Sequence, residues 1–217
     1  MSETEIRSES DRSPRRRRSD GERSRSAILR EAAQLATVDG IEGLSISRLA
    51  QAVGMSKSGL FAHFGSKEDL QLATIETAST LFSEQVVKPA SLAPTGLERL
   101  QQLAENFLRH VEESVFPGGC FFASVAAEMD THPGPVRDLA VQLTEDWLRQ
   151  LETAVRAAQA EGAIEASEDA AQLAFELDAY LLLANAQFVA RQESAPIERA
   201  RRAIERRLSV AAHTSVP

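Results

Sequence analysis

Apolar residues that recur every three or four positions constrain this chain more than any other feature of its sequence. Ile28, Ala32, Leu35 and Ala36 form one such stripe, which follows the 3.6-residue period of an α-helix. Leucine and alanine dominate the apolar content, and both lose little conformational freedom in a helix. Glycines and prolines separate the periodic stretches, and no stretch alternates as a strand does. The sequence therefore predicts an all-α fold of about nine helices.

The breaks between these stretches divide the chain into a tail and two domains. Residues 1–22 have almost no apolar side chain, so they cannot offset the entropy lost on ordering and are expected to be disordered. Residues 23–83 are expected to form an N-terminal domain that begins with three helices. Residues 84–217 contain longer amphipathic stretches and are expected to form a larger helical domain.

Charge is unevenly distributed along the chain, whose net charge is −8. Residues 1–67 carry 12 basic and 9 acidic side chains, whereas residues 68–217 carry 12 basic and 23 acidic ones. A basic front joined to an acidic body suggests that one end meets an anion. The cluster Arg15–Arg18 in the tail is either a solvated run or an arm that follows phosphates or enters a minor groove.

Several classes of protein are excluded by what the sequence contains. It has no run of about 18 uncharged apolar residues and no N-terminal signal pattern, so a cytoplasmic protein without a membrane segment is expected. One cysteine, Cys120, cannot form an internal disulfide, which fits a reducing compartment. The histidines His63, His110, His132 and His213 lack metal-ligand spacing. Without a nucleophile elbow or a phosphate-binding glycine loop, neither an enzyme nor a cofactor is expected.

Two short helices joined by a glycine turn are the most informative local feature. They are expected at residues 45–53 and 56–64, with Ser45 and Ser56 as N-caps and Gly54 in the left-handed conformation. This is the size of a helix-turn-helix, in which a short second helix enters the major groove and the first braces it.

The helical phase of this pair indicates which side chains face outward. Leu60 and Phe64 point toward the core, which leaves Lys57, Ser58 and Phe61 on the opposite face of the second helix. Gly59 permits a close approach of the backbone to DNA. On the first helix, Ser45 and Arg48 are candidates for phosphate contacts.

The local sequence narrows this interpretation further. The stretch LSISRLAQAVGMSKSGLFAHFGSKEDL, residues 44–70, resembles the TetR family of transcriptional regulators. The family pattern has Ser or Thr opening the second helix, then Ala-x-x-x-Gly-Val-Ser, Lys-x-x-Leu-Tyr-x-His-Phe and Ser-Lys-Glu-x-Leu. The helix expected at residues 26–39 also fits, so the resemblance covers about residues 24–72.

Carried over by position, the resemblance implies a set of DNA contacts. Phosphate contacts are implied for Ser45, Ser56, His63 and Lys67, and base contacts for Lys57 and Ser58, with Arg48 a further candidate. His63 has an alternative role in capping or packing, and Lys67 in simple solvation. Phe61 stands where the family has a phosphate-binding Tyr and lacks the hydroxyl, so it either packs on a sugar or thymine methyl or only fills space.

The larger domain is expected to provide dimerisation. Residues 177–190 are almost wholly apolar, and the last helix carries its own stripe, so these surfaces belong to a core or to an interface. The resemblance implies that the last two helices pair with their copies in a two-fold four-helix bundle. Such a homodimer places two recognition helices about 34–36 Å apart, one turn of DNA.

An effector pocket is expected in the same domain. It is assigned to inward-facing aromatic, sulfur and histidine side chains, for each of which core packing is the alternative: Phe107, His110, Phe116, Cys120, Phe121, Met129, Trp147, Phe175 and Phe188. The hypothesis is that a small apolar or aromatic effector binds there and releases operator DNA. Cys120 is either a redox-sensing thiol or a small buried hydrophobe.

The sequence thus predicts a DNA-binding transcriptional regulator, a repressor released from its operator by a small molecule. The alternative is a non-enzymatic helical interaction or ligand-binding protein that has lost sequence-specific DNA binding. Phe61 and the small basic excess leave this alternative open. Operator binding with a steep salt dependence separates the two.

Overall fold

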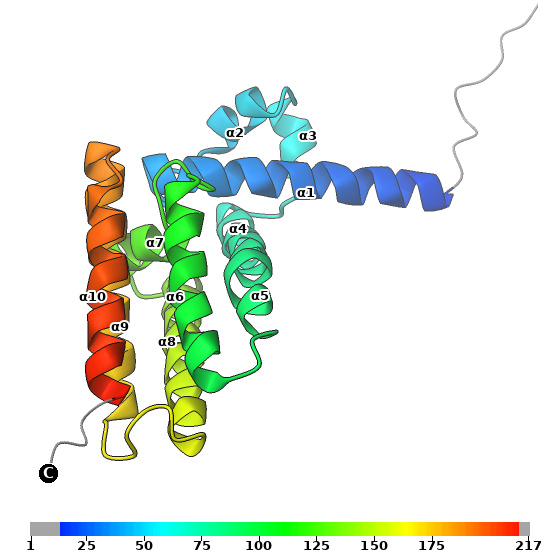
Figure 1. The fold of residues 1–217 in the computed structure, drawn as a ribbon. Coiled ribbons are helices and arrows are strands. Elements are labelled where there is room, and N and C mark those ends of the chain that lie inside the picture. Colours follow the sequence, from blue (N-terminus) through cyan, green and yellow to red (C-terminus); the bar gives the residue numbers. More distant parts are fainter. Residues whose placement is uncertain (1–13, 213–217) are drawn as a thin grey trace, which may run out of the picture.

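The computed structural model describes residues 14–212, and over that range every regular element is helical (Figure 1). In chain order the elements are α1 (Pro14–Asp39), α2 (Ile46–Ala52), α3 (Lys57–Phe61), α4 (Lys67–Phe82), the π-helical η1 (Ser83–Val87), α5 (Lys88–Ala90), α6 (Gly96–Glu112), α7 (Phe121–Met129), α8 (Pro135–Ala160), α9 (Ala170–Arg191) and α10 (Ala195–Ala212). Because α4, η1 and α5 follow one another without a break, the described part of the chain forms nine helical rods. The predicted all-α class is confirmed.

Helix α1 begins at Pro14, well before the start expected near Ser24. The disorder expected through residue 22 is therefore wrong for residues 14–22, whereas residues 1–13 lie outside the described residues. Proline is favourable in a first helical turn, and arginine is a good helix former, so this polar stretch extends the amphipathic helix behind it. The side chains of Arg15–Arg18 also lie outside the described residues, and their contact with DNA stays a prediction.

The rod formed by α4, η1 and α5 continues through Pro89, although a proline normally ends a helix before it. Proline lacks the amide hydrogen of a helical residue, and its ring clashes with the carbonyl four residues earlier. The wider π-helical turn of η1 directly before it relaxes this conflict. The rod runs across residue 83, where the sequence predicts a domain boundary. That boundary therefore does not coincide with a break in the helix, and it stays a prediction.

Side-chain caps begin most of the helices that the sequence predicts. The hydroxyl oxygens of Ser45, Ser56, Ser66 and Thr95 accept hydrogen bonds from backbone N–H groups three residues ahead. Ser167 fits the N-cap of α9 by its place in the sequence, but this prediction is wrong. Asp169 caps the helix instead, accepting from the N–H groups of Ala171 and Gln172 at 3.0 and 3.1 Å. A carboxylate accepts more strongly than a hydroxyl and suits the positive end of the helix dipole.

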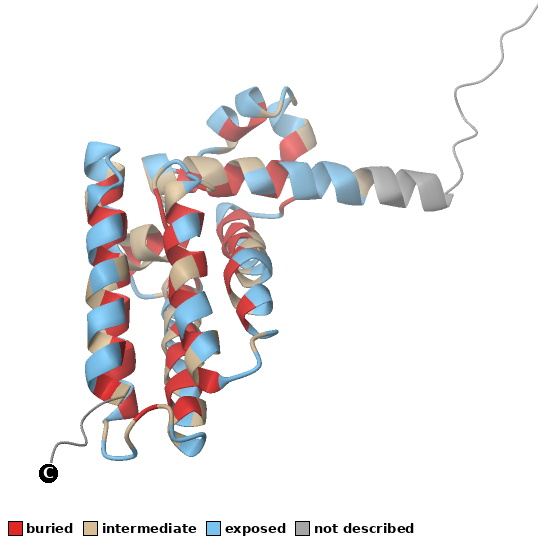
Figure 2. Cartoon of the chain, in the orientation of Figure 1, coloured by how far each residue is buried: buried red, intermediate tan, exposed pale blue. Residues whose placement is uncertain are grey.

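The buried side chains separate into three clusters. Along most of the helices, buried residues alternate with exposed ones (Figure 2). We call helices α1, α2, α3 and the start of α4 the head. Their shared core, the head core, contains Ile28, Leu29, Ala32, Leu44, Leu49, Ala50, Leu60, Phe64, Leu70 and Ala73. The junction core contains Ala33, Ala36, Ile41, Ile75, Ala78, Phe116, Phe121, Val125, Met129, Val136 and Ala140. The body core lies among α6, α8, α9 and α10 and includes Phe107, Trp147, Leu177 and Ile204.

These cores set the arrangement in space. Helices α6, α8, α9 and α10 run side by side as the body, and α1 crosses one end of it (Figure 1). Helices α2 and α3 lie on the outer side of α1, away from the body. The junction core, between head and body, is built from α1, α4, α7, α8 and the segment before α7.

Helix α9 is apolar on two sides. Within the described residues it is the one helix long and apolar enough, by length and composition, to cross a membrane. Its inner side packs into the body core through Leu173, Leu177 and Leu181. Its outer side leaves Phe175 and Leu183 exposed in the single chain.

Gly118 provides a test of the close contact between head and body. It precedes α7 and lies so near the end of α1 that an added Cβ would overlap the carbonyl of Thr37. Because backbone cannot rotate away as a flexible side chain does, Gly118→Ala is expected to lower the free energy of unfolding by about 1–3 kcal/mol. Urea denaturation measures this change.

The matched control is Gly21→Ala on α1, where no atom lies within 4 Å of the added Cβ. Replacing a helical glycine by alanine without strain is expected to raise stability by about 0.5–1 kcal/mol. Equal stability of the two variants would contradict the close contact at Gly118.

Candidate DNA-binding surface and effector pocket

The α2–α3 pair has the geometry of a helix-turn-helix on an outer surface. Leu49 of α2 and Leu60 of α3 are fully buried in the head core, so they fix both helices on α1. Gly54, between them, has φ +66°, a left-handed conformation that suits glycine. Helix α3 ends at Phe61, so it is shorter than the predicted 56–64. Its outer face is directed away from the body (Figure 1).

The residues predicted to contact DNA are almost all accessible. Those classed as exposed are Ser45, Arg48, Ser56, Lys57, Ser58, Phe61 and Lys67, and those classed as half-buried are Gly59 and His63. All but Lys67 belong to α2, α3 and the turns beside them, and Lys67 is the first residue of α4. Their contacts with DNA stay predictions.

The two capping serines are already fixed in orientation. Ser45 Oγ accepts from the N–H of Arg48 at 3.2 Å, and Ser56 Oγ accepts from the N–H of Gly59 at 3.1 Å. A serine hydroxyl that accepts one bond still has an O–H to donate. Each capping serine can therefore begin its helix and donate to a phosphate at the same time.

Two of the expected phosphate-binding cations hold acidic partners in the free protein. Arg48 pairs with Asp39 at 2.6 Å, and Lys67 Nζ lies 2.7 Å from the carbonyl oxygen of Glu42 and 3.4 Å from its carboxylate. A hydrogen bond from Gln71 and the charge of Lys67 hold the pKa of Glu42 below its usual value. The side chains of Arg48 and Lys67 are about half exposed, and ion pairs open to solvent contribute little stability, so a phosphate can replace the acidic partner.

Phe61 and Arg25 add to this surface in ways the sequence pattern left open. Phe61 is 53% exposed, so it is free to contact DNA, and its role there stays a prediction. Arg25, on α1, places its guanidinium 5.2 Å from the centre of the Phe64 ring. It is a further exposed cation on the head, and periodicity alone gave no reason to include it.

Helix α7 holds the head through the turn between α1 and α2. The two carboxylate oxygens of Glu128 accept from the N–H groups of Ile41 and Glu42, at 2.7 and 2.8 Å. Gly40 has φ +81°, and an added Cβ there would lie 2.6 Å from the same carboxylate. We call this pair of hydrogen bonds the Glu128 clamp. It ties the helix-turn-helix to the body by one side chain.

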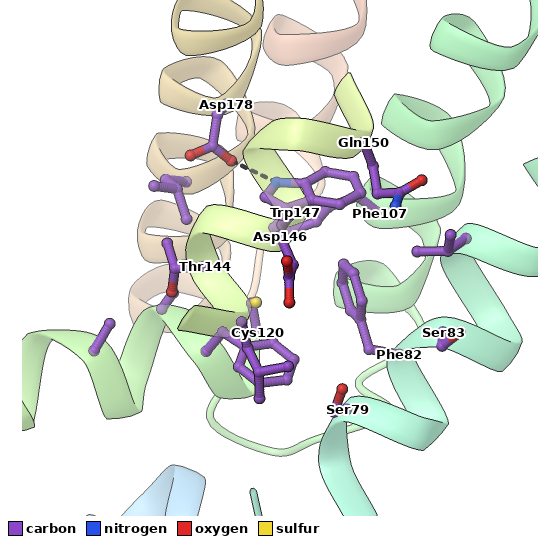
Figure 3. Close-up of a pocket in the computed structure, with 16 residues that line it drawn as sticks. Ser79, Phe82, Ser83, Phe107, Cys120, Thr144, Asp146, Trp147, Gln150 and Asp178 are labelled. Atoms are coloured by element: carbon purple, nitrogen blue, oxygen red, sulfur yellow. Dashed lines mark hydrogen bonds between the residues drawn. The ribbon is translucent and has the colours of Figure 1, made fainter. Parts of the chain in front are cut away.

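On another side of α7, a cavity of about 480 Å³ opens between this helix, the rod that contains α4, and the helices of the body (Figure 3). Its lining comes from α4, η1, α6, α7, α8 and α9 and comprises Ser79, Phe82, Ser83, Val87, Phe107, Cys120, Phe122, Ala123, Ala126, Leu143, Thr144, Asp146, Trp147, Gln150, Asp178 and Leu182. The volume and the mostly apolar lining are typical of a small-molecule site.

The predicted pocket residues divide into two groups. Phe107, Cys120 and Trp147 line the cavity, and their contact with an effector stays a prediction. The other expected positions do not line this cavity: His110, Phe116, Phe121, Met129, Phe175 and Phe188. Phe116, Phe121 and Met129 pack in the junction core, whereas Phe175 is 62% exposed. Helical phase identifies inward-facing side chains, but it does not distinguish a packed core from a cavity.

His110 and Cys120 are both uncharged groups in this body. His110 lies outside the cavity, with Nδ1 2.7 Å from Oε1 of Gln85, and burial lowers its pKa to about 4. Burial raises the pKa of the Cys120 thiol to about 11. A redox-sensing cysteine needs thiolate character, so the environment of Cys120 fits the small buried hydrophobe. Within the described residues, no three acidic, histidine or cysteine side chains gather where they could hold a metal ion.

Asp178 lines the cavity but was not among the predicted pocket residues, which were aromatic, sulfur-containing or histidine side chains. Its position in the sequence gave a signal for it. It is a carboxylate within the almost wholly apolar stretch of α9, and it is only 7% exposed. Trp147 Nε1 donates a hydrogen bond to its Oδ1 at 2.8 Å (Figure 3). Burial raises the pKa of Asp178 above its usual value.

Two family models match this arrangement. The one described as "Bacterial regulatory proteins, tetR family" covers residues 28–74, which include α2 and α3. The one described as "Tetracyclin repressor-like, C-terminal domain" covers residues 96–204, half of the chain. The chain belongs to the TetR family of transcriptional regulators. It is therefore a DNA-binding protein of the helix-turn-helix type.

Individual TetR-family proteins show the same relationship over most of the chain. Transcriptional regulator AcuR of Cereibacter sphaeroides is 28% identical over 155 residues, which are 68% of each protein. A TetR transcriptional regulator from Chloroflexus aurantiacus is 25% identical with a TM-score of 0.81, over 90% of this chain and 97% of its own. AibR, solved with isovaleryl coenzyme A and operator DNA, is 23% identical with a TM-score of 0.67, over 87% of this chain and 98% of its own.

The Glu128 clamp gives a test of how this TetR-family protein positions its head. Glu128→Gln leaves one amide oxygen for two N–H donors and removes the charge, and hydrogen bonds to charged groups contribute about 1.5–3 kcal/mol. We expect the amide hydrogens of Ile41 and Glu42 to exchange at least tenfold faster, as measured by hydrogen exchange and NMR.

Glu145→Gln is the control, because Glu145 is an exposed glutamate of α8 that pairs only loosely with Arg149, at 3.6 Å. It should leave both amide exchange rates unchanged. Unchanged rates in Glu128→Gln as well would show that the clamp does not hold the turn.

Proposed function

We propose that this protein is a homodimeric, cytoplasmic repressor that binds a palindromic operator through α3 and is released by a small molecule in the cavity. The observation that carries the proposal is the α2–α3 pair, capped by Ser45 and Ser56 and directed away from the body. In this pair α3 enters the major groove with Lys57 and Ser58 at base edges. Ser45, Ser56 and Lys67 bind the phosphates on either side.

The outer side of α9 and the adjoining face of α10 support dimerisation. Phe175 and Leu183 are 62% and 58% exposed on α9. A groove between the two helices is lined by Tyr180, Leu183, Ala184, Gln187, Pro196, Arg199, Ala200 and Ala203. Large apolar side chains gathered on one face favour association, and a two-fold axis makes the same face serve both copies.

Helix α7 supports release by an effector. Phe122, Ala123 and Ala126 of this helix line the cavity, and Glu128 of the same helix clamps the turn that leads into α2. A ligand that shifts α7 therefore changes the position of the head on the body. The spacing of the two recognition helices, about 34–36 Å for adjacent grooves, is then lost. AibR, which has the same fold, was solved with both a small molecule and operator DNA.

The experiment that tests this proposal is selection of duplexes from a random DNA pool with the full-length protein. Enrichment of a palindrome with half-sites about one helical turn apart, or closely overlapping, is the expected result. No enrichment at low salt would overturn it and favour an interaction protein that keeps the fold without reading DNA.

Lys57 provides a test within the selected operator. Lys57→Ala is expected to weaken operator binding by about 5- to 150-fold, because a side chain at the base edges contributes about 1–3 kcal/mol. Fluorescence anisotropy at several salt concentrations measures the effect.

The matched control is Lys88→Ala, an exposed lysine of α5 on the body. It should leave the affinity within twofold of the unaltered protein. A similar loss in both variants would mean that Lys57 contributes only general charge.

Leu183 tests the dimer. Leu183→Glu places a charge on the exposed apolar face of α9 and is expected to produce a monomer in sedimentation experiments. Because a monomer reaches only one half-site, operator binding should fall at least 100-fold. Leu92→Glu, at an 85% exposed residue between α5 and α6, is the control and should leave the dimer intact. A Leu183→Glu protein that stays dimeric would place the interface elsewhere.

A further inference from the structure

Four aromatic rings surround one part of the cavity. Phe82 lies nearly perpendicular to Phe107, Phe122 and Trp147, with ring centres 6.2, 5.7 and 5.2 Å apart. Phe107 and Trp147 stack on each other at 5.7 Å. Rings that meet at right angles form adjoining walls, and the electron-rich face of such a wall attracts cations as well as apolar groups. The rings alone fit either kind of ligand.

The charges of the cavity separate these two possibilities. Its lining, all of it within the described residues, contains Asp146 and Asp178 but no lysine, arginine or histidine. Asp146 is 47% exposed and pairs with Arg149, which does not line the cavity. An anionic ligand would therefore meet like charge with no basic side chain to compensate it.

Asp178 is the decisive group, because it is buried and its charge is not compensated. The bond from Trp147 Nε1 satisfies part of the carboxylate but supplies no positive charge. Among the described residues, no lysine, arginine or histidine forms an ion pair with Asp178, and the side chain that donates to it is the uncharged Trp147. A buried carboxylate without a cation is costly, whereas an asparagine would accept the same bond from Trp147 without that cost. A bound cation would remove the cost of keeping an aspartate here.

We propose that the cavity binds an organic monocation that carries a compact apolar group. The charged end of this ligand lies among Trp147, Phe82 and Asp178. This inference rests on the proposed function, since it names the class of effector for the same cavity. The aromatic rings contact the apolar group of the ligand, and Asp178 provides the charge opposite to that of the ligand. The cavity volume of about 480 Å³ is larger than that of a single ammonium group, so the ligand can carry an attached ring or chain.

Trp147 is also the natural reporter for this site. It is the only tryptophan in the chain, and it lines the cavity, so its fluorescence responds to a ligand bound there. The probes are benzyltrimethylammonium, its neutral isostere neopentylbenzene and the similarly shaped anion phenylmethanesulfonate. They are titrated at matched concentrations below the solubility limit of neopentylbenzene.

We expect the cation to change Trp147 fluorescence in a saturable way and to bind at least tenfold more tightly than neopentylbenzene. The anion should produce no saturable change. Asp178→Asn, which keeps an acceptor for Trp147, should weaken binding of the cation at least tenfold and leave binding of neopentylbenzene unchanged. Glu145→Gln is the control, and its effect on the cation should stay below threefold because this carboxylate is exposed and does not line the cavity.

Three results would overturn the inference: equal or tighter binding of neopentylbenzene, undiminished cation binding by a folded Asp178→Asn protein, or no saturable change with the cation. A melting curve of each variant establishes that it is folded. Selection from the random DNA pool is run on the same preparation, so the two proposals fail separately. Cation binding without an enriched operator would overturn the proposed function alone, and an enriched operator with a preference for the neutral probe would overturn the ligand class alone.

Discussion

The attachment of the helix-turn-helix to the body depends on the junction around α7. Two N–H groups of the turn after α1 would otherwise have no partner from the helices on either side, and Glu128 accepts from both. The same turn is supported by Ile41, which is fully buried in the junction core. A head held by hydrogen bonds and by an apolar contact surface has a defined orientation, which two recognition helices need if both are to reach the same face of DNA.

In the proposed function, this junction is the route by which a ligand in the cavity affects DNA binding. Helix α7 has only nine residues, so the cavity lining and the clamp lie within about two turns of each other. Gly118 packs on the end of α1, and Gln34 of α1 donates to the carbonyl of Val115 at 2.8 Å, so the segment before α7 is fixed to the head as well. A rigid helix with contacts at both places transmits a displacement between them. Coupling of this kind is reciprocal, because a ligand that weakens operator binding is itself bound more weakly when operator is present.

The sequence predicted the head better than the cavity, for physical reasons. Caps, a glycine turn and apolar periodicity are local properties, and Ser45, Gly54 and Leu60 all adopt the expected roles. A cavity depends on how helices far apart in the sequence leave space between them, which helical phase does not reveal. Phe107 and Phe188 both lie on the buried faces of their helices, but Phe107 lines the cavity and Phe188 does not. The signal that the pattern did contain was Asp178, a charge in an otherwise apolar helix.

The measurement that tests the central claim most directly is hydrogen exchange of the protein with and without its selected operator, followed by mass spectrometry. It needs no knowledge of the effector, because reciprocal coupling requires operator binding to alter the body. We expect slower exchange in α3, in the turn at Ile41 and Glu42, and also in α7 (Phe121–Met129), where the cavity lining begins. Changes confined to α2, α3 and the first turn of α4, with α7 unaffected, would contradict the claim that this helix links the cavity to DNA.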